Sequence, residues 1–467
     1  MRKSLSISLL TLILLSTANG QIVSATSVSE SDNQQKLDSN FVVTKDNTKE
    51  QFQKTIDYLK EQKIEVKQAI PEIGWIETAK TTAQEQNKIE DNTPSIVKEP
   101  TKNDTYKTSS LREQDKMFWN EQWNMQKLAS KDTKINNGQL NKLTIGIIDS
   151  GLNQGYRNML KDKIRYTENF VPTGGFANQD GDEYGNPNDI EDRKGHGTSV
   201  TSLILGTNYM AGIAPDVKVD EYRVFSRKGS NPTWVLKALV KAADNGDDII
   251  NMSLGRYGII TGGYGNSNQN DSAEFEAWTR AVEYAKKKGS VVVVAAGNES
   301  LNLDNSQEIV DYINKEHPGL NAHGEGKSLP GSIPGIIQVA ATGASGKRAD
   351  FSCYSKDSIY APGGDTSKTG LENPNINLVP SEWIMTYGGH HDRDYHYSVG
   401  TSFSAPEVSG MLAHLVADNN LEKQPDQIKQ KLSETLVKDQ QGLNNVTLDS
   451  ILNHSKLSKD QGQPAAA

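Results

Sequence analysis

The chain alternates between stretches with the apolar pattern of buried strands and stretches with the spacing of helices. The apolar run Leu143–Ile148, rich in β-branched residues, is typical of a parallel strand buried on both faces. Further strand patterns occupy residues 218–225, 248–254 and 290–296. Helical patterns occupy residues 198–205, 233–245 and 272–288. This alternation predicts βαβ units and therefore an α/β fold with a mostly parallel, doubly wound sheet.

The part of the chain before residue 80 has a shorter pattern. Residues 41–44 and 70–78 have the composition of strands, and apolar residues recur with helical spacing over 51–61. A strand–helix–strand unit of this size is too small for an enzyme domain, but it suits a propeptide that packs on a partner domain. Residues 79 to about 115 are mostly polar, which predicts an exposed linker that contains the maturation cleavage site.

The first residues have the pattern of a secretory signal. Arg2 and Lys3 precede an apolar stretch at Leu5–Leu15 that is shorter than a membrane span, and we place cleavage after Ala25. No later stretch approaches about 18 apolar residues, so we expect no transmembrane segment. The closing residues contain no Leu-Pro-x-Thr-Gly wall-sorting motif. We therefore expect an exported protein, and the two alternatives for its tail are that the protein is released or that the tail is truncated.

Charge and cysteine content exclude some classes of function. The formal net charge is −9, whereas binding to phosphates needs a basic face, so we expect no nucleic acid partner. The only cysteine, Cys353, leaves no internal disulfide, and nothing near it in the sequence suggests an activated thiol. We interpret Cys353 as a small buried side chain and expect a large hydrophobic core to stabilise the fold.

Three short motifs contain the side chains of a nucleophilic site: Asp149 in IIDSG, His196 in GHGT and Ser402 in GTSFSAP. Taken singly, each motif has an ordinary interpretation: Asp149 can be a turn residue at a strand end, the glycines around His196 a flexible turn, and Ser402 a helix N-cap. Taken together they are specific. Serine needs a neighbouring base to become a nucleophile, histidine has a pKa near working pH, and a carboxylate on the far ring nitrogen fixes the tautomer.

The surroundings of Ser402 add a local prediction. Gly400 precedes it, and a helical stretch follows. We expect Ser402 at a helix N-terminus, where free N–H groups favour developing negative charge, with Pro406 tolerated in the first turn.

These motifs, in the order Asp, His, Ser, resemble the subtilase family of serine proteases, for which that chain order is known. The resemblance runs from about Trp119 to about Leu452 and includes NMSLG at 251–255 and AAGN at 295–298. It implies a subtilisin-like three-layer fold beside the small α+β propeptide, and it makes the three motif residues catalytic.

The resemblance assigns roles to further residues. It implies that the Asn298 side chain and the Ser402 backbone N–H form an oxyanion hole. It also implies that Ser253, Leu254 and Gly255 form one side of a groove that binds an extended peptide. We therefore expect a signal peptide at 1–25, a propeptide and linker at 26–105, a catalytic domain at 106–455 and a polar tail at 456–467.

Acidic residues lie close to two of the motifs. The loop before His196 contains Asp180, Asp182, Glu183, Asp189, Glu191 and Asp192. This loop can bind basic substrate side chains, can hold a structural Ca²⁺, or is a solvated surface loop. Glu299 directly follows Asn298. We expect it at the rim of the S1 pocket, which binds the substrate residue P1 just before the scissile bond, where its charge favours a basic P1 residue. We expect that catalysis requires no cofactor, and the sequence leaves the metal ligands unknown.

A second candidate metal site lies shortly before Ser402. Residues 388–396 contain His390, His391 and His396 beside Asp392 and Asp394. The alternatives are a metal site and an exposed loop that leads to the nucleophile.

Within the family, the signal, the short propeptide and the polar linker resemble the lantibiotic leader peptidases. This resemblance implies a secreted, extracellular serine endopeptidase that cleaves the leader from a lantibiotic precursor peptide, after a basic residue. The expected partners are that precursor and the chain's own propeptide, and we expect a monomer. One alternative is a general secreted subtilase that trims or degrades other proteins. Another is an inactive subtilase fold that serves as a binding module.

Overall fold

The computed structural model describes residues 39–98 and 116–453, with gaps at 47, 72–73, 131–132, 136 and 389–394. The predicted signal peptide at 1–25 and the polar tail at 456–467 lie outside these residues. The chain forms two compact units, one before and one after residue 110. Within the described ranges, no helix is long and apolar enough to cross a membrane.

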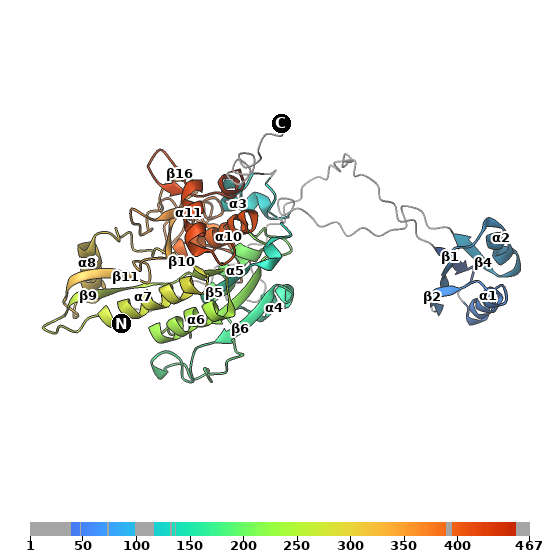
Figure 1. Cartoon of the computed structure of the whole chain (residues 1–467), viewed down its shortest axis with the longest axis horizontal. Helices are drawn as coiled ribbons and strands as arrows, with labels where there is room; N and C mark the ends of the chain where they lie inside the picture. Colours follow the sequence, from blue (N-terminus) through green and yellow to red (C-terminus); the bar gives the residue numbers. More distant parts are fainter. Residues whose placement is uncertain are drawn as a thin grey trace, which may run out of the picture. The chain divides into compact units, whose positions relative to one another are not determined.

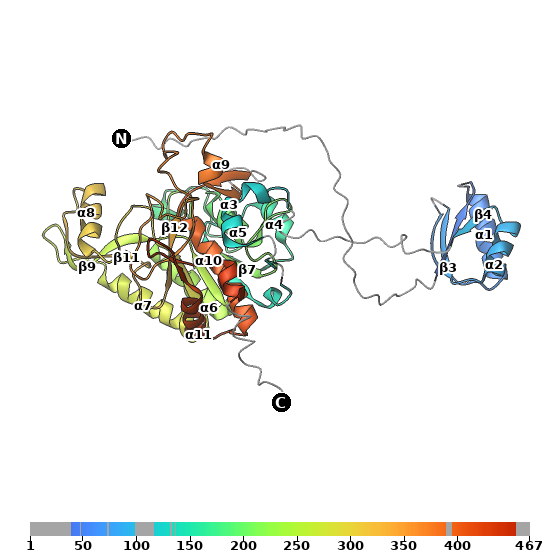
Figure 2. The same ribbon diagram turned by 90° about the horizontal axis from the view of Figure 1, so that it is seen from above.

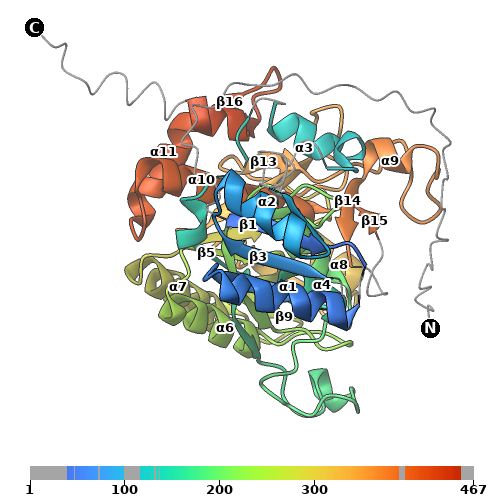
Figure 3. The same ribbon diagram turned by 90° about the vertical axis from the view of Figure 1, so that its right-hand side faces the viewer.

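The N-terminal unit is an antiparallel sheet with two helices. Its elements are β1 (Ser39–Thr44), α1 (Lys49–Glu61), β2 (Val66–Ile70), β3 (Trp75–Ala79), α2 (Ala83–Asn92) and β4 (Ser95–Lys98). The strand order is β2-β3-β1-β4, and Figure 3 shows α1 and α2 beside each other against this sheet. The small core contains Val42, Leu59, Ile76 and Ile89, all fully buried.

This unit differs from the prediction in two places. The stretch predicted as one strand at 70–78 spans the end of β2 and most of β3, two strands joined by a turn. The linker predicted from residue 79 is wrong as far as Lys98, because α2 and β4 complete the fold there. A capping box between Thr82 and Glu85 starts α2, and Ile89 is its one buried residue. So short an apolar signal in a polar stretch does not stand out in the sequence.

The C-terminal unit is built on a nine-stranded sheet of order β16-β17-β13-β12-β10-β8-β5-β7-β6. The strands are β5 (Thr144–Asp149), β6 (Ile164–Asn169), β7 (Lys218–Arg223), β8 (Ile249–Met252), β10 (Val291–Ala295), β12 (Ile337–Thr342), β13 (Ile359–Pro362), β16 (Val437–Lys438) and β17 (Asn444–Asn445). All neighbours are parallel except β16 and β17. The chain starts the sheet at β5 and places β6 and β7 on one side of it and β8, β10, β12 and β13 on the other, which confirms the doubly wound sheet.

Helices cover both faces of this sheet (Figures 1 and 2). The helices α5 (His196–Leu205) and α10 (Thr401–Asn419) pack on one face, and α6 (Pro232–Asn245) and α7 (Ser272–Lys287) pack on the other. Successive side chains of a strand point to opposite faces. Ile147 of β5 therefore joins the core under α5 and α10, while Ile148 joins the core under α6 and α7. Two apolar cores around one sheet make the three-layer fold.

Shorter elements surround these layers. They are α3 (Trp123–Leu128), α4 (Gln154–Leu160), α8 (Ser306–Glu316), α9 (Val379–Glu382), α11 (Pro425–Thr435), β9 (Arg256–Tyr264), β11 (Ala322–Leu329), β14 (Ile384–Tyr387), β15 (Tyr395–Ser398) and the 3-10 turns η4 (Trp119–Glu121), η5 (Leu140–Lys142) and η6 (Phe176–Asn178). Strands β9 and β11 pair antiparallel outside the main sheet, and α8 packs against them.

Candidate active site

The carboxyl ends of the central strands bring the motif residues to one edge of the sheet. Strand β5 ends at Asp149, β8 leads into Ser253, and β10 leads toward Asn298. These three strands are neighbours and parallel, so their carboxyl ends meet. Ligand sites of doubly wound sheets lie at this edge.

Asp149 and His196 form a hydrogen-bonded pair. Asp149 is fully buried, and its Oδ1 lies 2.7 Å from Nδ1 of His196, the first residue of α5. The Ser150 N–H donates to the same oxygen at 2.7 Å. Because an ionised carboxylate can only accept, the proton of the imidazole lies on Nδ1. The other ring nitrogen, Nε2, is then free to act as a base.

The electrostatic surroundings set the basicity of this imidazole. Burial is the largest single influence on His196 and lowers its pKa, because it disfavours the charged ring. The charge and hydrogen bond of Asp149, with a further contribution from Asp192, outweigh burial and the opposing charge of Lys194. The pKa of His196 therefore lies above its ordinary value.

Ser402 lies in the first turn of α10, next to Phe403. The neighbouring ring of Phe403 has its centroid 5.7 Å from that of His196. The Ser402 hydroxyl donates to the Ser253 carbonyl at 3.2 Å, and between Ser402 and His196, both described in the structure, there is no hydrogen bond. The hydroxyl must therefore turn from Ser253 to His196 before it can act as a nucleophile. Such loose geometry is common in the absence of substrate.

Pro406 has a role that differs from the predicted one. It lies in the second turn of α10, not the first, and its missing N–H would have bonded to the Ser402 carbonyl four residues earlier. That carbonyl accepts instead from the Ser253 hydroxyl at 2.8 Å. Pro406 thus frees a backbone oxygen that ties the nucleophile turn to the end of β8.

Asn298 presents its amide N–H groups beside the nucleophile turn. Its Oδ1 accepts from the Thr401 N–H at 2.9 Å and from the Thr401 hydroxyl at 3.1 Å. A backbone N–H can only donate, so these contacts fix which end of the amide is oxygen. At Gly400, φ is +147°, and a Cβ there would lie 3.3 Å from Asn298 Nδ2. Oδ1 of Asn298 is thereby committed to Thr401, which leaves Nδ2 as the end of the amide that can donate to another group.

The residues assigned to the substrate groove lie between β8 and β9. Ser253 exchanges hydrogen bonds with Ser402 in both directions and is buried, Leu254 is half-buried, and Gly255 is exposed. The three residues are outside the strands of the sheet. This placement suits a segment whose backbone pairs with an extended peptide.

Glu299 follows Asn298 and is anchored at one carboxylate oxygen. Its Oε2 accepts from the Asn298 N–H at 2.7 Å, from the Tyr257 hydroxyl and, at 3.5 Å, from the Cys353 thiol. A Cβ on Gly297 (φ +111°) would clash with the Tyr257 hydroxyl at 2.5 Å, so only glycine admits this arrangement. Cys353 is fully buried, as predicted, and burial raises the pKa of its thiol.

The acidic loop before His196 is folded inward and bonded to arginines. Glu183 is buried against the fully buried Arg223. Three further carboxylates pair with arginines at the loop surface: Asp189 with Arg193 at 2.6 Å, Glu191 with Arg157 at 2.8 Å, and Asp182 with Arg227 at 3.1 Å. Asp180 and Asp192 are buried and accept hydrogen bonds from backbone N–H groups. The interpretation as a solvated loop is therefore wrong for Glu183. In the parts of the chain that the structure describes, no group of three or more His, Cys, Asp or Glu side chains is arranged to hold a metal ion.

The second candidate metal site is described only in part. His396 lies in β15, and its Nε2 is 3.1 Å from the Thr386 hydroxyl and 3.3 Å from the Ser199 hydroxyl. His390, His391, Asp392 and Asp394 lie outside the described residues.

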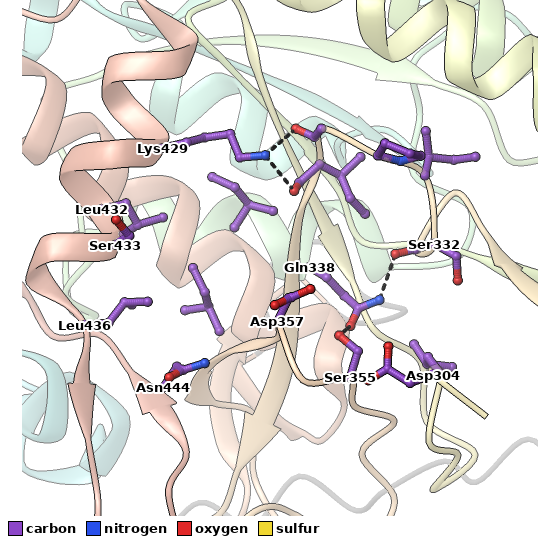
Figure 4. Close-up of a pocket in the computed structure, with 18 of the residues that line it drawn as sticks. Asp304, Ser332, Gln338, Ser355, Asp357, Lys429, Leu432, Ser433, Leu436 and Asn444 are labelled. Atoms are coloured by element: carbon purple, nitrogen blue, oxygen red, sulfur yellow. Dashed lines mark hydrogen bonds between the residues drawn. The ribbon is translucent and has the colours of Figure 1, made fainter.

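A cavity of about 600 Å³ lies between α11 and the segment from Gly331 to Gln338 (Figure 4). Lys429 bridges it by donating to the carbonyls of Gly335 at 3.1 Å and Ile336 at 3.4 Å. None of the catalytic motif residues lines this cavity. It is separate from the candidate active site.

Sequence reasoning missed the residues that hold the motif side chains in place. Thr401 fixes the Asn298 amide, Ser150 and Asp192 hold the region around His196, and Tyr257 holds Glu299. Thr401 and Ser150 stand directly beside motif residues, which is the one signal that pointed to them. Tyr257 is distant from Glu299 in sequence, so only the fold could reveal it.

Comparison with known proteins finds relatives that are serine proteases. The nisin leader peptide-processing serine protease NisP of Lactococcus lactis subsp. lactis is 36% identical over 341 residues, which cover 71% of this chain and 48% of that protein. The epidermin leader peptide-processing serine protease EpiP of Staphylococcus epidermidis is 30% identical over 326 residues, covering 66% of this chain and 67% of that protein. This chain thus spans about half the length of the first relative and about two thirds of the second.

Solved structures of such proteases superpose on the chain. The nisin leader peptidase from Lactococcus lactis has a TM-score of 0.66 at 33% identity, covering 72% of this chain and 94% of that one. The epidermin leader peptide processing protease from Staphylococcus aureus has a TM-score of 0.64 at 28% identity, covering 91% and 99%. The family model described as the subtilase family matches residues 141–458. Because that match spans well over half of the sequence and contains Asp149, His196 and Ser402, the chain belongs to the subtilase family.

Proposed function

We propose that this chain is a serine endopeptidase that cleaves the leader from a lantibiotic precursor peptide, after a basic residue. The observation that carries the proposal is the Asp149–His196 hydrogen bond at the end of β5, with Ser402 and the oriented Asn298 amide beside it. The likeness to the nisin and epidermin leader-processing proteases supports the choice of substrate.

The geometry supports a two-step acyl transfer. His196 Nε2 removes the Ser402 hydroxyl proton as Ser402 Oγ attacks the peptide carbonyl, and the buried Asp149 carboxylate stabilises the imidazolium that forms. The carbonyl oxygen becomes negative and accepts from Asn298 Nδ2 and from the Ser402 N–H, which is in the first turn of α10 and has no intrahelical acceptor. His196 then gives its proton to the leaving amine, and water hydrolyses the acyl-enzyme by the same route.

Glu299 supports a preference for Lys or Arg at P1. Its Oε2 is held by Tyr257 and by the Asn298 N–H, so the carboxylate is fixed next to the residue that binds the scissile carbonyl. A fixed carboxylate near the reacting bond attracts a cationic side chain more strongly than one that must be ordered on binding.

The N-terminal unit supports the rest of the proposal. It is a compact fold separate from the catalytic unit, which suits an inhibitory propeptide that is removed after export. In this scheme the mature protease is extracellular and monomeric, needs no cofactor for catalysis, and can carry a structural Ca²⁺.

The test is incubation of the purified protein with a lantibiotic precursor peptide, followed by mass spectrometry of the products. We expect one cut at the leader junction by the wild type and none by Ser402→Ala. Cleavage of unfolded casein without a cut at the junction would favour a general subtilase instead.

The P1 preference has its own test. Glu299→Gln should lower kcat/KM for a peptide with Arg at P1 by about 10-fold relative to one with Leu at P1. Glu325→Gln, which removes a half-buried carboxylate of β11 that pairs with Lys327, is the matched control. An unchanged Arg-to-Leu ratio in Glu299→Gln would show that Glu299 does not select P1.

A further inference from the structure

Asp192, in the acidic loop, points away from solvent and toward the start of the catalytic helix. Its side chain is buried. One oxygen, Oδ2, accepts from the N–H of Thr198 at 2.9 Å and from the Thr198 hydroxyl at 2.7 Å. The other oxygen, Oδ1, accepts from the N–H groups of Lys194 at 3.1 Å and Gly195 at 2.8 Å. A single carboxylate thus bonds the backbone on both sides of His196.

These bonds replace a missing helix cap. The N-cap of α5 is Gly195, which has no side chain to accept from the free N–H groups of the first turn. Asp192 supplies that acceptor from outside the helix, and its negative charge also suits the positive end of the helix dipole. His196 is the first residue of this turn, so its position depends on how firmly the turn is held.

A second set of bonds connects Asp192 to the catalytic carboxylate. The Ser150 hydroxyl donates to Asp192 Oδ1 at 2.7 Å and accepts from the Gly197 N–H at 2.8 Å. The Ser150 N–H donates to Asp149 Oδ1, the oxygen that also binds His196. Ser150 therefore joins Asp192, Asp149 and the first turn of α5 in one network.

We propose that Asp192 is a positioning residue of the active site, which fixes the first turn of α5 and, through Ser150, the Asp149 carboxylate, so that Asp149 and His196 are at hydrogen-bonding distance before substrate binds. The inference rests on the proposed function, because the network matters for catalysis only if His196 acts as the base. Asp192 itself need not touch the substrate.

Asp192 also acts on His196 through its charge. The charged groups that affect the imidazole are Asp149 and Asp192, which favour its protonated form, and Lys194, which opposes it. Glu221 of β7 is buried near Asp149 and Asp192, and burial with the repulsion of these two carboxylates raises its pKa well above the ordinary value. Removal of the Asp192 charge should therefore make His196 easier to deprotonate.

The decisive variant is Asp192→Asn in the full chain, measured with a generic peptide substrate after active-site titration. We expect kcat to fall by about 10- to 100-fold with KM within about 2-fold, since a small misplacement of a catalytic group has costs of this size. The acid limb of the plot of kcat against pH reports the fraction of His196 that is neutral. This limb should move to lower pH by about 0.5 to 1 pH unit.

Two further variants separate position from charge. Ser150→Ala removes the hydroxyl that connects Asp192 to the Gly197 N–H, but it changes no charged group. We therefore expect kcat to fall while the acid limb of the pH profile stays in place. Asp189→Asn removes a negative charge from the same loop, where Asp189 pairs with Arg193, and should leave both quantities unchanged. If Asp192→Asn does not fold, Ser150→Ala still tests whether the hydrogen-bond network positions Asp149 and His196.

A readout that does not need cleavage keeps this inference distinct from the proposed function. The low-field proton resonance of His196 Nδ1 should titrate at lower pH in Asp192→Asn than in the wild type. If the wild type cleaves no peptide but this shift is seen, the proposed function fails and the role of Asp192 stands. Wild-type kcat and an unmoved titration in Asp192→Asn would overturn the inference.

Discussion

The two halves of the active site are held in different ways. On one side, Asp149 and His196 are fixed by their own bond of 2.7 Å and by the Ser150 and Asp192 network behind it. On the other side, the Ser402 hydroxyl donates to the Ser253 carbonyl and not to His196. The base is thus set in place before substrate arrives, whereas the nucleophile has one rotation left to make.

This difference has a physical reason. The orientation of an imidazole cannot be corrected during proton transfer without loss of rate, so the base and its carboxylate gain from being fixed in advance. A serine hydroxyl turns about one bond at little cost, and a weak bond of 3.2 Å to Ser253 is easily exchanged. Substitutions on the nucleophile side test this division, and one in the body of α10 tests stability alone; they are described from the largest expected effect on activity to the smallest.

Ser402→Ala removes the nucleophile and should abolish the acyl-enzyme route. We expect kcat to fall by at least about 10⁴-fold, a loss of the size measured for triad residues in a subtilase. The fold should be unchanged, because the Ser253 hydroxyl still bonds to the backbone carbonyl of residue 402. Peptide hydrolysis by purified protein measures the loss, and activity near the wild-type level would show that Ser402 is not the nucleophile.

Asn298→Ala removes the side-chain donor to the oxyanion. We expect kcat to fall by about 100- to 1000-fold with little change in KM, the cost found for the corresponding donor in subtilisin. Thr401→Val is the informative companion, because it keeps the backbone N–H bond to Asn298 Oδ1 but removes the hydroxyl bond, and it should cost much less. A rise in KM alone would mean that Asn298 binds the ground state.

Ser253→Ala leaves the Ser402 carbonyl without its donor. The expected effect is a few-fold lower kcat and a loss of about 1 kcal/mol in the free energy of unfolding, typical for one unpaired carbonyl. Adding Pro406→Ala restores a helix N–H that can bond the same carbonyl and should recover part of both losses. If the double variant is no better than the single one, the carbonyl does not control the nucleophile turn.

Glu407→Gln should not change kcat, but it should change how stability depends on pH. Glu407 is fully buried in α10 and binds Asn124 of α3, and burial raises its pKa well above the ordinary value. The native state therefore keeps a proton that the unfolded chain loses above about pH 4.3, so the wild type loses stability as pH rises from there toward the native pKa. Thermal unfolding of both proteins at pH 5 and pH 8 measures this. The stability of Glu407→Gln relative to the wild type should be higher at pH 8 than at pH 5. An equal difference at both pH values would contradict the shifted pKa.

Much of the site could be predicted because its signals are local. The buried strand before Asp149 and the glycine-flanked His196 and Ser402 are short motifs in which each residue has a stereochemical reason. The strands and helices predicted from the hydrophobic pattern agree with β5, β8, β10, α5, α6 and α7 within a few residues. The second half of the N-terminal unit was missed, because one buried Ile89 in a polar stretch is too weak a pattern to read without its partners.

The sequence by itself determined the class of fold and the family, and it named the candidate nucleophile, base and carboxylate, because strand burial and motif chemistry depend on neighbours along the chain. Only the tertiary structure decided what the acidic residues do. Glu183 and Asp192 lie in the same loop, yet one is buried against Arg223 and the other caps the catalytic helix. A carboxylate bonds to whatever donors the fold brings within about 3 Å, and for these residues that included positions far along the chain.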